Sequence, residues 1–238
     1  MKNDLDFQII VPFFNEEENF KQFIKLVETI QLYDEVFIIV DNGSDTDFLE
    51  NYYKNQKKIS GWTFVKSEKN LGFGGGVKFG SKYAVKEYIA WMPGNLKVDP
   101  REAFKLFLNQ DLNGEKLHIK CRRMNRPLID AIKTSLFGIV ASFYFRTLLF
   151  DAGGTPNLIN KKFFLDDSGY PNDFSFDLFV YYFFKKNDFT LSRPKINYTT
   201  RMYGKSHWQK GIISEIELMI SILNYKKSWN KLLNNYEY

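Results

Sequence analysis

The chain has 238 residues, a formal charge of +5 and a single cysteine. Hydrophobic residues make up 44% of it and charged residues 26%, a balance that excludes disorder, which goes with low hydrophobicity and high net charge. One cysteine excludes an intrachain disulfide and a multi-cysteine zinc site, and residues 1–6 hold no apolar signal core, so we expect a cytoplasmic protein. Basic residues lie in short, scattered pairs, and we expect no nucleic-acid partner.

The first hundred residues alternate between short apolar runs and amphipathic segments. Strands are predicted at Phe7–Val11, Val36–Val40, Trp62–Lys66 and Tyr88–Met92. A helix is predicted from Asn15 onward, and a glycine-containing helix over Gly74–Tyr88. Strands that alternate with helices predict an α/β fold with a mostly parallel sheet, and such sheets bind ligands at the carboxyl ends of their strands.

Beyond Pro100 the pattern is less regular. Its predicted elements are a helix at Arg101–Asn109, a strand at Leu117–Lys120, an apolar helix at Leu128–Leu149, a helix at Asp173–Lys186, a strand at Thr190–Tyr198 and an amphipathic helix at Trp208–Leu223. The apolar stretch at 136–150 is interrupted by polar residues and is shorter than the ~20 residues that span a bilayer, so we expect no membrane crossing. We expect this helix and the C-terminal one to be core elements, with an interfacial face as the alternative.

Polar side chains follow the first two predicted strands. Val11–Phe20 contains a run of amide and acidic residues, and Val40–Asp45 contains two aspartates, an asparagine and a serine. An acidic or amide side chain at the carboxyl end of a strand can bond a base edge or a ribose hydroxyl, and Gly43 permits a tight turn. A simple helix-capping turn is the competing interpretation of the second segment.

These two segments resemble those of the family-2 glycosyltransferases, particularly dolichol-phosphate-mannose-synthase-like and bacterial surface-polysaccharide members. Four further segments extend the resemblance in the same order, namely Asn70–Gly76, Trp91–Pro100, Asp151–Ile159 and Arg201–Trp208. The resemblance covers residues 7–211 and implies the GT-A fold. It implies one domain over residues 1–211, with a nucleotide-binding half to about residue 100, an acceptor-side half after it, and a C-terminal amphipathic helix and tail at 212–238.

The resemblance implies transfer of a sugar from a nucleotide-sugar to a saccharide or polyprenyl-phosphate acceptor, in surface polysaccharide or glycolipid assembly, with peripheral contact at the inner face of the membrane. The residues that it places around the donor are Pro12, Phe14, Glu16, Val40, Asp41, Asn42, Gly72, Gly94, Asn95, Lys97, Arg123, Arg201, Lys205 and His207. Asp177 and Asp151 are candidates for the base that a sugar-hydroxyl acceptor needs. A phosphate acceptor needs no base, because its oxygen is already a nucleophile at neutral pH.

Two of these segments depart from the family's pattern, at three positions. Asn42 stands where a second aspartate is common, and its amide both donates and accepts hydrogen bonds. Pro93 and Asn95 replace the two aspartates of the metal region, so Asn95 is the one metal-ligand candidate there and dependence on Mg²⁺ or Mn²⁺ is in question. We expect Lys97, with Arg123 or Arg201, to neutralise part of the diphosphate charge instead.

Two alternatives stay open at this point. The glycine-rich segment Gly72–Gly76 either brings backbone close to a ligand or packs tightly on the sheet. The altered metal motif also fits a catalytically impaired protein that binds a nucleotide-sugar or serves as a scaffold. A nucleotidyltransferase is disfavoured, because the first strand is not followed by the glycine-rich, arginine-containing loop that binds a triphosphate.

Overall fold

The structure is a computed structural model that describes residues 5–32, 34–56, 61–164, 169–201, 203, 222, 225, 229 and 230. In this part of the chain a central sheet has the strand order β3-β2-β1-β4-β7-β5-β8, and β6 and β9 form a separate parallel pair. The strands are β1 (Phe7–Phe13), β2 (Phe37–Asp41), β3 (Trp62–Lys66), β4 (Tyr88–Trp91), β5 (Leu117–Lys120), β6 (Arg122–Met124), β7 (Asn157–Asn160), β8 (Thr190–Ser192) and β9 (Lys195–Asn197).

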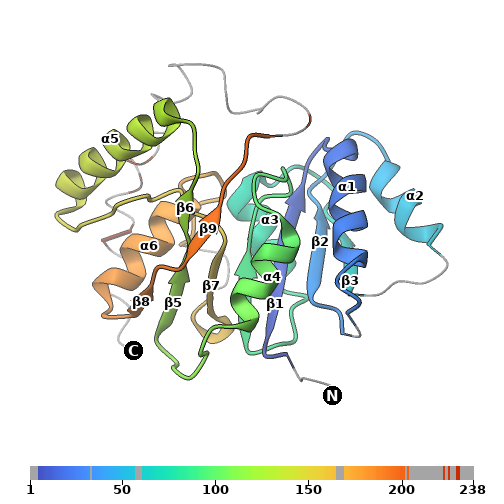
Figure 1. Cartoon of the computed structure of the whole chain (residues 1–238), viewed down its shortest axis with the longest axis horizontal. Helices are drawn as coiled ribbons and strands as arrows, with labels where there is room; N and C mark the ends of the chain where they lie inside the picture. Colours follow the sequence, from blue (N-terminus) through green and yellow to red (C-terminus); the bar gives the residue numbers. More distant parts are fainter. Residues whose placement is uncertain are drawn as a thin grey trace.

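Helices cover both faces of this sheet (Figure 1). One face packs against α1 (Glu17–Glu28), α2 (Phe48–Lys54) and α4 (Pro100–Leu108). The other face packs against α3 (Gly72–Ser81) and α6 (Phe176–Lys186), while α5 (Leu128–Phe145) lies beside α6 and the 3-10 turn η1 (Lys161–Phe163) follows β7. The residues of β1, β2 and β4 are all buried, as a sheet covered on both faces requires.

The expected α/β fold with a mostly parallel sheet is confirmed, and one strand departs from it. β1 pairs in parallel with β2 and β4, and β2 with β3. β7 runs antiparallel to both β4 and β5, because the chain leaves through β6 and α5 and re-enters from the opposite end. Asn157, the first residue of β7, therefore pairs with Trp91 and Lys120, the last residues of β4 and β5.

The glycines of α3 pack directly on the sheet. A side-chain carbon at Gly80 would lie 2.5 Å from Ile10 and 2.8 Å from Val40, and one at Gly76 would lie 3.0 Å from Pro12. The tight-packing interpretation of the glycine-rich segment therefore holds for α3, and the helix lies close beneath the ends of β1 and β2.

Several predicted boundaries differ from the structure. The helix predicted over Gly74–Tyr88 ends at Ser81, and the strand predicted at Thr190–Tyr198 is divided into β8 and β9 at Pro194, which cannot donate a ladder hydrogen bond. The apolar helix ends at Phe145, since Arg146 takes a left-handed conformation with φ of 51°. Residues 208–221 and 223, from the predicted helix at Trp208–Leu223, lie outside the described residues.

The expectation that the long apolar helix is a core element is wrong. Within α5 only Gly138, Ala141 and Phe145 are buried, and the large apolar residues on its other side are exposed. Apolar residues occur around most of this helix, so the sequence did not reveal which narrow face contacts the domain. Among the described residues, α5 is the helix whose length and composition suit a membrane span, with mean hydropathy 1.4.

Candidate active site

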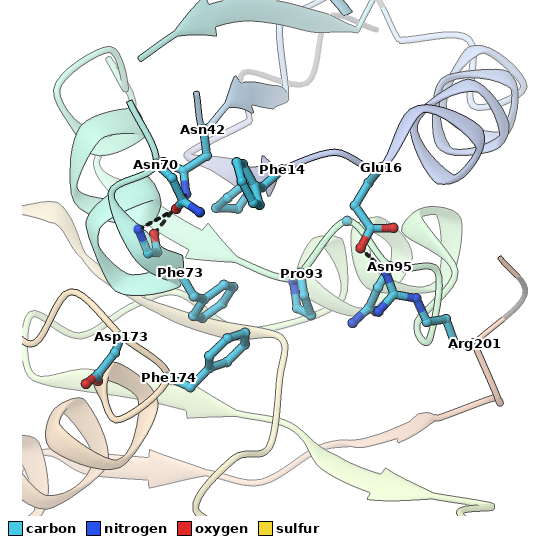
Figure 2. A pocket seen from close by; sticks show the side chains of 13 residues that line it. Phe14, Glu16, Asn42, Asn70, Phe73, Pro93, Asn95, Asp173, Phe174 and Arg201 are labelled. Atoms are coloured by element: carbon cyan, nitrogen blue, oxygen red, sulfur yellow. Dashed lines mark hydrogen bonds and ion pairs between the residues drawn. The ribbon is translucent and has the colours of Figure 1, made fainter. Parts of the chain in front are cut away.

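A pocket of about 250 Å³ opens at the carboxyl edge of β1, β2 and β4 (Figure 2). Its walls come from the loops after these three strands, the loop between β3 and α3, the segment before α6, and one arginine. The lining residues are Pro12, Phe14, Glu16, Asn42, Asn70, Gly72, Phe73, Pro93, Gly94, Asn95, Asp173, Phe174 and Arg201. The sequence therefore located the right edge of the sheet, and eight of the residues proposed for the donor line one cavity: Pro12, Phe14, Glu16, Asn42, Gly72, Gly94, Asn95 and Arg201.

Asn42 fixes the shape of the glycine-rich wall. Its Nδ2 donates to Gly72 O at 3.0 Å, and its Oδ1 accepts from Leu71 N at 3.3 Å. Gly72 has φ of +75°, and a side-chain carbon there would lie 2.4 Å from Asn172 O, so this position requires glycine. A carboxylate at position 42 could not donate to Gly72 O, which gives a physical reason for asparagine in place of aspartate.

Aromatic rings form the opposite wall. Phe73 and Phe174 stack with their centroids 5.3 Å apart and an angle of 4° between their planes. Figure 2 shows these rings facing the cavity, with Phe14 and Pro93 on its far side. A flat, apolar wall of this kind suits the face of a base or a sugar ring.

Five lining residues were missing from the sequence-based set. They are Asn70, Phe73, Pro93, Asp173 and Phe174. Asn70, Phe73 and Pro93 belong to motif segments already recognised, so their position in those segments was an available signal. The segment just before α6 brings Asp173 and Phe174 to the pocket, and Asp173 Oδ1 accepts from Ser175 N at 2.8 Å in the turn that leads into the helix.

Arg201 is the cation that lines the pocket. Its guanidinium forms an ion pair with Glu16, and its Nε donates to Tyr203 O at 2.7 Å. Asn19 connects the two ends of this pair, because its Nδ2 donates to the Glu16 carboxylate and to Tyr203 O, the latter at 3.2 Å. The side chains of Arg201 and Glu16 are 13% and 15% exposed, so a ligand in the pocket can reach this pair.

Asp41 lies buried at the end of β2, directly before Asn42. Its Oδ1 accepts from Ser44 N at 2.9 Å, which forms the turn that Gly43 allows with φ of +74°. Its Oδ2 is buried and has no hydrogen-bond partner in the part of the chain that the structure describes. Asp41 is fully buried and, although the sequence placed it around the donor, it is not among the residues that line the pocket; it shapes the turn that carries Asn42. The neighbouring Val40 packs in the core and does not line the pocket.

Two of the predicted phosphate-binding cations lie outside the pocket. Lys97 Nζ lies 5.7 Å from the ring centroid of Tyr198, and Arg123 stacks on the same ring at 5.3 Å. Arg123 is 9% exposed and ion-paired with Asp151. Lys205 and His207 lie outside the described residues.

Asp151 is held away from the pocket by arginines. Arg123 Nε donates to its Oδ1 at 2.8 Å, and Arg126 and Arg193 approach its carboxylate at 3.7 and 4.0 Å. Burial acts to raise the pKa of Asp151, but Arg123 outweighs it and the pKa is lowered. This position favours a structural ion pair over a catalytic base.

Asp177 belongs to a buried polar network beneath the pocket. Its Oδ1 accepts from Trp91 Nε1 at 2.8 Å and from Asn157 Nδ2 at 3.1 Å, and burial raises its pKa despite the nearby Lys120. Lys120 Nζ donates to Gly154 O at 2.8 Å, and burial lowers the pKa of Lys120 to about 8. The network joins β4, β5, β7 and α6, so Asp177 acts as a structural anchor, and its role as a base remains a prediction.

The pocket does not fit a divalent cation held by carboxylates. Its acidic side chains are Glu16, paired with Arg201, and Asp173, which accepts hydrogen bonds from Ser175. Asn95 Oδ1 accepts from Lys97 N at 3.2 Å and so completes its own turn. Among the described residues there is no cluster of three or more His, Cys, Asp or Glu side chains that could hold a metal ion. Mg²⁺ normally takes one or two carboxylates in addition to phosphate oxygens.

Comparisons with solved structures identify the fold. Glucosyl-3-phosphoglycerate synthase from Mycobacterium tuberculosis, in complex with Mn²⁺, uridine diphosphate and glucosyl-3-phosphoglycerate, superposes with a TM-score of 0.69 at 13% sequence identity, over 94% of this chain and 81% of that one. Its complex with Mn²⁺, UDP-glucose and phosphoglyceric acid gives 0.66 at 11% identity, over 94% and 80%. These likenesses confirm the expected GT-A fold.

Comparisons of sequence identify the family. The chain is 29% identical to the uncharacterized protein MJ0544 of Methanocaldococcus jannaschii over an alignment of 152 positions that covers 57% of this chain and 65% of that protein. The family model described as glycosyl transferase family 2 matches residues 8–127, about half of the chain. The matched range contains the loops after β1, β2 and β4 that form the pocket. The protein therefore belongs to glycosyltransferase family 2.

Proposed function

We propose that this protein transfers a hexosyl group from a nucleoside-diphosphate sugar to a saccharide or polyprenyl-phosphate acceptor. The reaction serves surface polysaccharide or glycolipid assembly in the cytoplasm, at the inner face of the membrane. The observation that carries the proposal is the pocket itself, in which the family's motif loops converge on Arg201, the one cation that lines it among the residues the structure describes. We further propose one catalytic domain over residues 1–211, followed by a C-terminal helix and tail.

The donor fits the pocket in one orientation. The polar wall at Asn42 and Asn70 suits the hydrogen-bonding edge of the nucleoside. Arg201, near Glu16, suits the diphosphate, because a guanidinium bonds phosphate oxygens in a bidentate manner. When the diphosphate binds, its charge competes with Glu16 for this arginine.

The transfer forms a bond from an acceptor oxygen to the anomeric carbon and breaks the bond from that carbon to the diphosphate. The electron pair leaves with the nucleoside diphosphate, and Arg201 stabilises the negative charge that develops there. A sugar-hydroxyl acceptor must also lose a proton, and Asp177 is the candidate to take it. A phosphate acceptor transfers no proton, so Asp177 then has only its structural role.

The arginine replaces part of the charge that a metal would supply. The solved relatives contain Mn²⁺ with their nucleotide, whereas the pocket described above lacks a matching carboxylate set. One solved relative is in complex with phosphoglyceric acid as well as UDP-glucose, which supports a phosphate-bearing acceptor for this chain.

The proposal is tested by measuring nucleoside-diphosphate release from a panel of nucleotide-sugars, with saccharide and polyprenyl-phosphate acceptors, in Mg²⁺, in Mn²⁺ and in EDTA. We expect release with at least one donor, and we expect EDTA to leave most of it. Calorimetry that detects no binding of any donor would overturn the proposal. A strict requirement for Mn²⁺ would overturn the role given to Arg201.

A second candidate function is a nucleotide-sugar-binding or scaffold protein of the same family. The observation in its favour is the motif at Pro93 and Asn95, which removes two carboxylates from the site. Donor binding without release of nucleoside diphosphate, over the full set of acceptors, would favour this function over transfer.

A further inference from the structure

The outer face of α5 is apolar and exposed. Its large apolar residues fall within an arc of about 120° when residues are placed 100° apart around the helix. They are Leu128, Ile129, Ile132, Leu136, Ile139, Val140 and Phe143, and we call them the α5 stripe. The most exposed is Phe143, at 89%.

α5 contacts the rest of the domain through its opposite side. Gly138 and Ala141 are buried there, and Phe145 packs against Tyr182 at 4.6 Å and Trp229 at 5.4 Å between ring centroids. Figure 1 shows α5 at one end of the molecule, beside α6 and away from the sheet. The helix therefore keeps its position by a small contact and directs the stripe outward.

A stripe of this composition needs a partner. The solvent-facing side of a helix is normally polar, and contiguous exposed apolar patches mark interaction sites. Leu148 and Phe150, just beyond the helix, are 60% and 53% exposed and lengthen the apolar surface.

Exposed basic residues lie within α5 and in the segments next to it in the chain. Arg122 lies before α5, Lys133 borders the stripe, and Arg146 ends the helix, and all three are exposed. Asp130 is the one acidic residue between 128 and 145. Apolar residues flanked by lysine and arginine are the composition of helices that lie in the interface of anionic membranes.

Both ends of α5 are fixed to the same domain, so the helix lies along a membrane surface and does not cross it. Before the helix, Met124 in β6 pairs with Asn197 in β9. After it, Asp151 is bonded to Arg123, and the chain then enters β7. A helix that spans a bilayer separates its ends by about 30 Å of hydrocarbon, which these two attachments do not permit.

We infer that α5 is a lipid-docking helix, which buries the α5 stripe in the interface of an anionic leaflet while Arg122, Lys133 and Arg146 contact lipid phosphates. The inference goes beyond the proposed function, because docking requires no sugar transfer. Where the acceptor is lipid-linked, as in the proposed function, docking brings the enzyme and the acceptor to the same membrane surface.

The test is flotation of the full chain with vesicles of equimolar phosphatidylcholine and phosphatidylglycerol, compared with phosphatidylcholine alone. We expect binding to the anionic vesicles. The double variant Leu136→Gln/Phe143→Gln should weaken it by at least about tenfold, because two apolar side chains leave the lipid. Both residues are exposed, at 58% and 89%, so the thermal midpoint should not fall.

Two further variants separate apolar from electrostatic contributions. Val85→Gln, at an 81% exposed valine outside α5, is the matched control and should bind like the wild type. Lys133→Gln with Arg146→Asn should weaken binding by roughly fivefold for each charge removed. The asparagine suits the left-handed conformation of position 146.

Three outcomes would overturn the inference. The wild type could fail to bind anionic vesicles, or the stripe variant could bind as tightly as the wild type. Sedimentation velocity could instead show a dimer that the stripe variant dissociates, which would make α5 a contact between copies of this chain. Donor binding, measured by calorimetry without vesicles, decides the proposed function separately, since the stripe variant should retain it.

Discussion

The pocket and the network beneath it use similar charged residues in opposite ways. At the pocket, Arg201 and Glu16 form an ion pair whose side chains both line the cavity. In the network, Asp177 accepts two hydrogen bonds and Arg123 is enclosed with Asp151. Charged groups that a ligand can reach thus form the binding site. The charged groups of the network satisfy one another and are not available to a ligand.

The largest effect should come from removing the charge of Asp177. Asp177→Asn leaves Lys120 buried with its counter-charge lost, and we expect the free energy of unfolding to fall by about 3 kcal/mol. Urea denaturation measures this change. The matched control is Asp188→Asn at an exposed position with φ of 58°, which should be neutral. Equal losses of unfolding free energy in both variants would contradict the structural role given to Asp177 in the buried network.

The same network should make stability depend on alkaline pH. Burial lowers the pKa of Lys120 from 10.5 to about 8 in the folded protein, so between these values the unfolded chain binds the extra proton. The contribution of Lys120 to the free energy of unfolding is therefore lowest below pH 8. It rises by about 3 kcal/mol between pH 8 and pH 10.5.

Denaturation of the wild type and of Lys120→Met across this range measures the effect. The difference in unfolding free energy between them should grow with pH in favour of the wild type. Lys116→Met, at an exposed lysine just before β5, should show a constant difference. A constant difference for Lys120→Met as well would show that the Lys120 ammonium is not destabilised by burial.

At the pocket, Arg201→Gln should weaken donor binding by about thirtyfold, because a charged hydrogen bond to the diphosphate is worth about 2 kcal/mol. Isothermal calorimetry with the best donor measures it. Arg101→Gln, at an exposed arginine paired with Asp99, is the control and should leave affinity unchanged. Unchanged affinity in Arg201→Gln would mean that another cation binds the diphosphate.

The smallest effect concerns the aromatic wall. Phe174→Leu removes the ring that stacks on Phe73, and we expect the KM for the donor to rise by about fivefold, or about 1 kcal/mol. Initial-rate kinetics measures it, with Tyr83→Leu, an exposed aromatic outside the pocket, as the control. A change in kcat without a change in KM would place the ring against the reacting atoms instead.

Much of the fold could be predicted because local patterns report it. Apolar runs identified β1 to β5, and alternation with helices indicated the parallel sheet. The reversal of β7 and the division at Pro194 were not predicted, because strand direction depends on long-range pairing that local residues do not encode.

By itself the sequence determined the family, the edge of the sheet that carries the pocket, and most of its lining, since those residues follow strands whose ends meet by topology. Only the tertiary structure decided which charges are available to a ligand. The family resemblance places both Arg123 and Arg201 around the donor, yet one is closed off by Asp151 and the other lines the cavity. Tertiary structure also left the α5 stripe exposed, because burial depends on what packs against a helix and not on its composition.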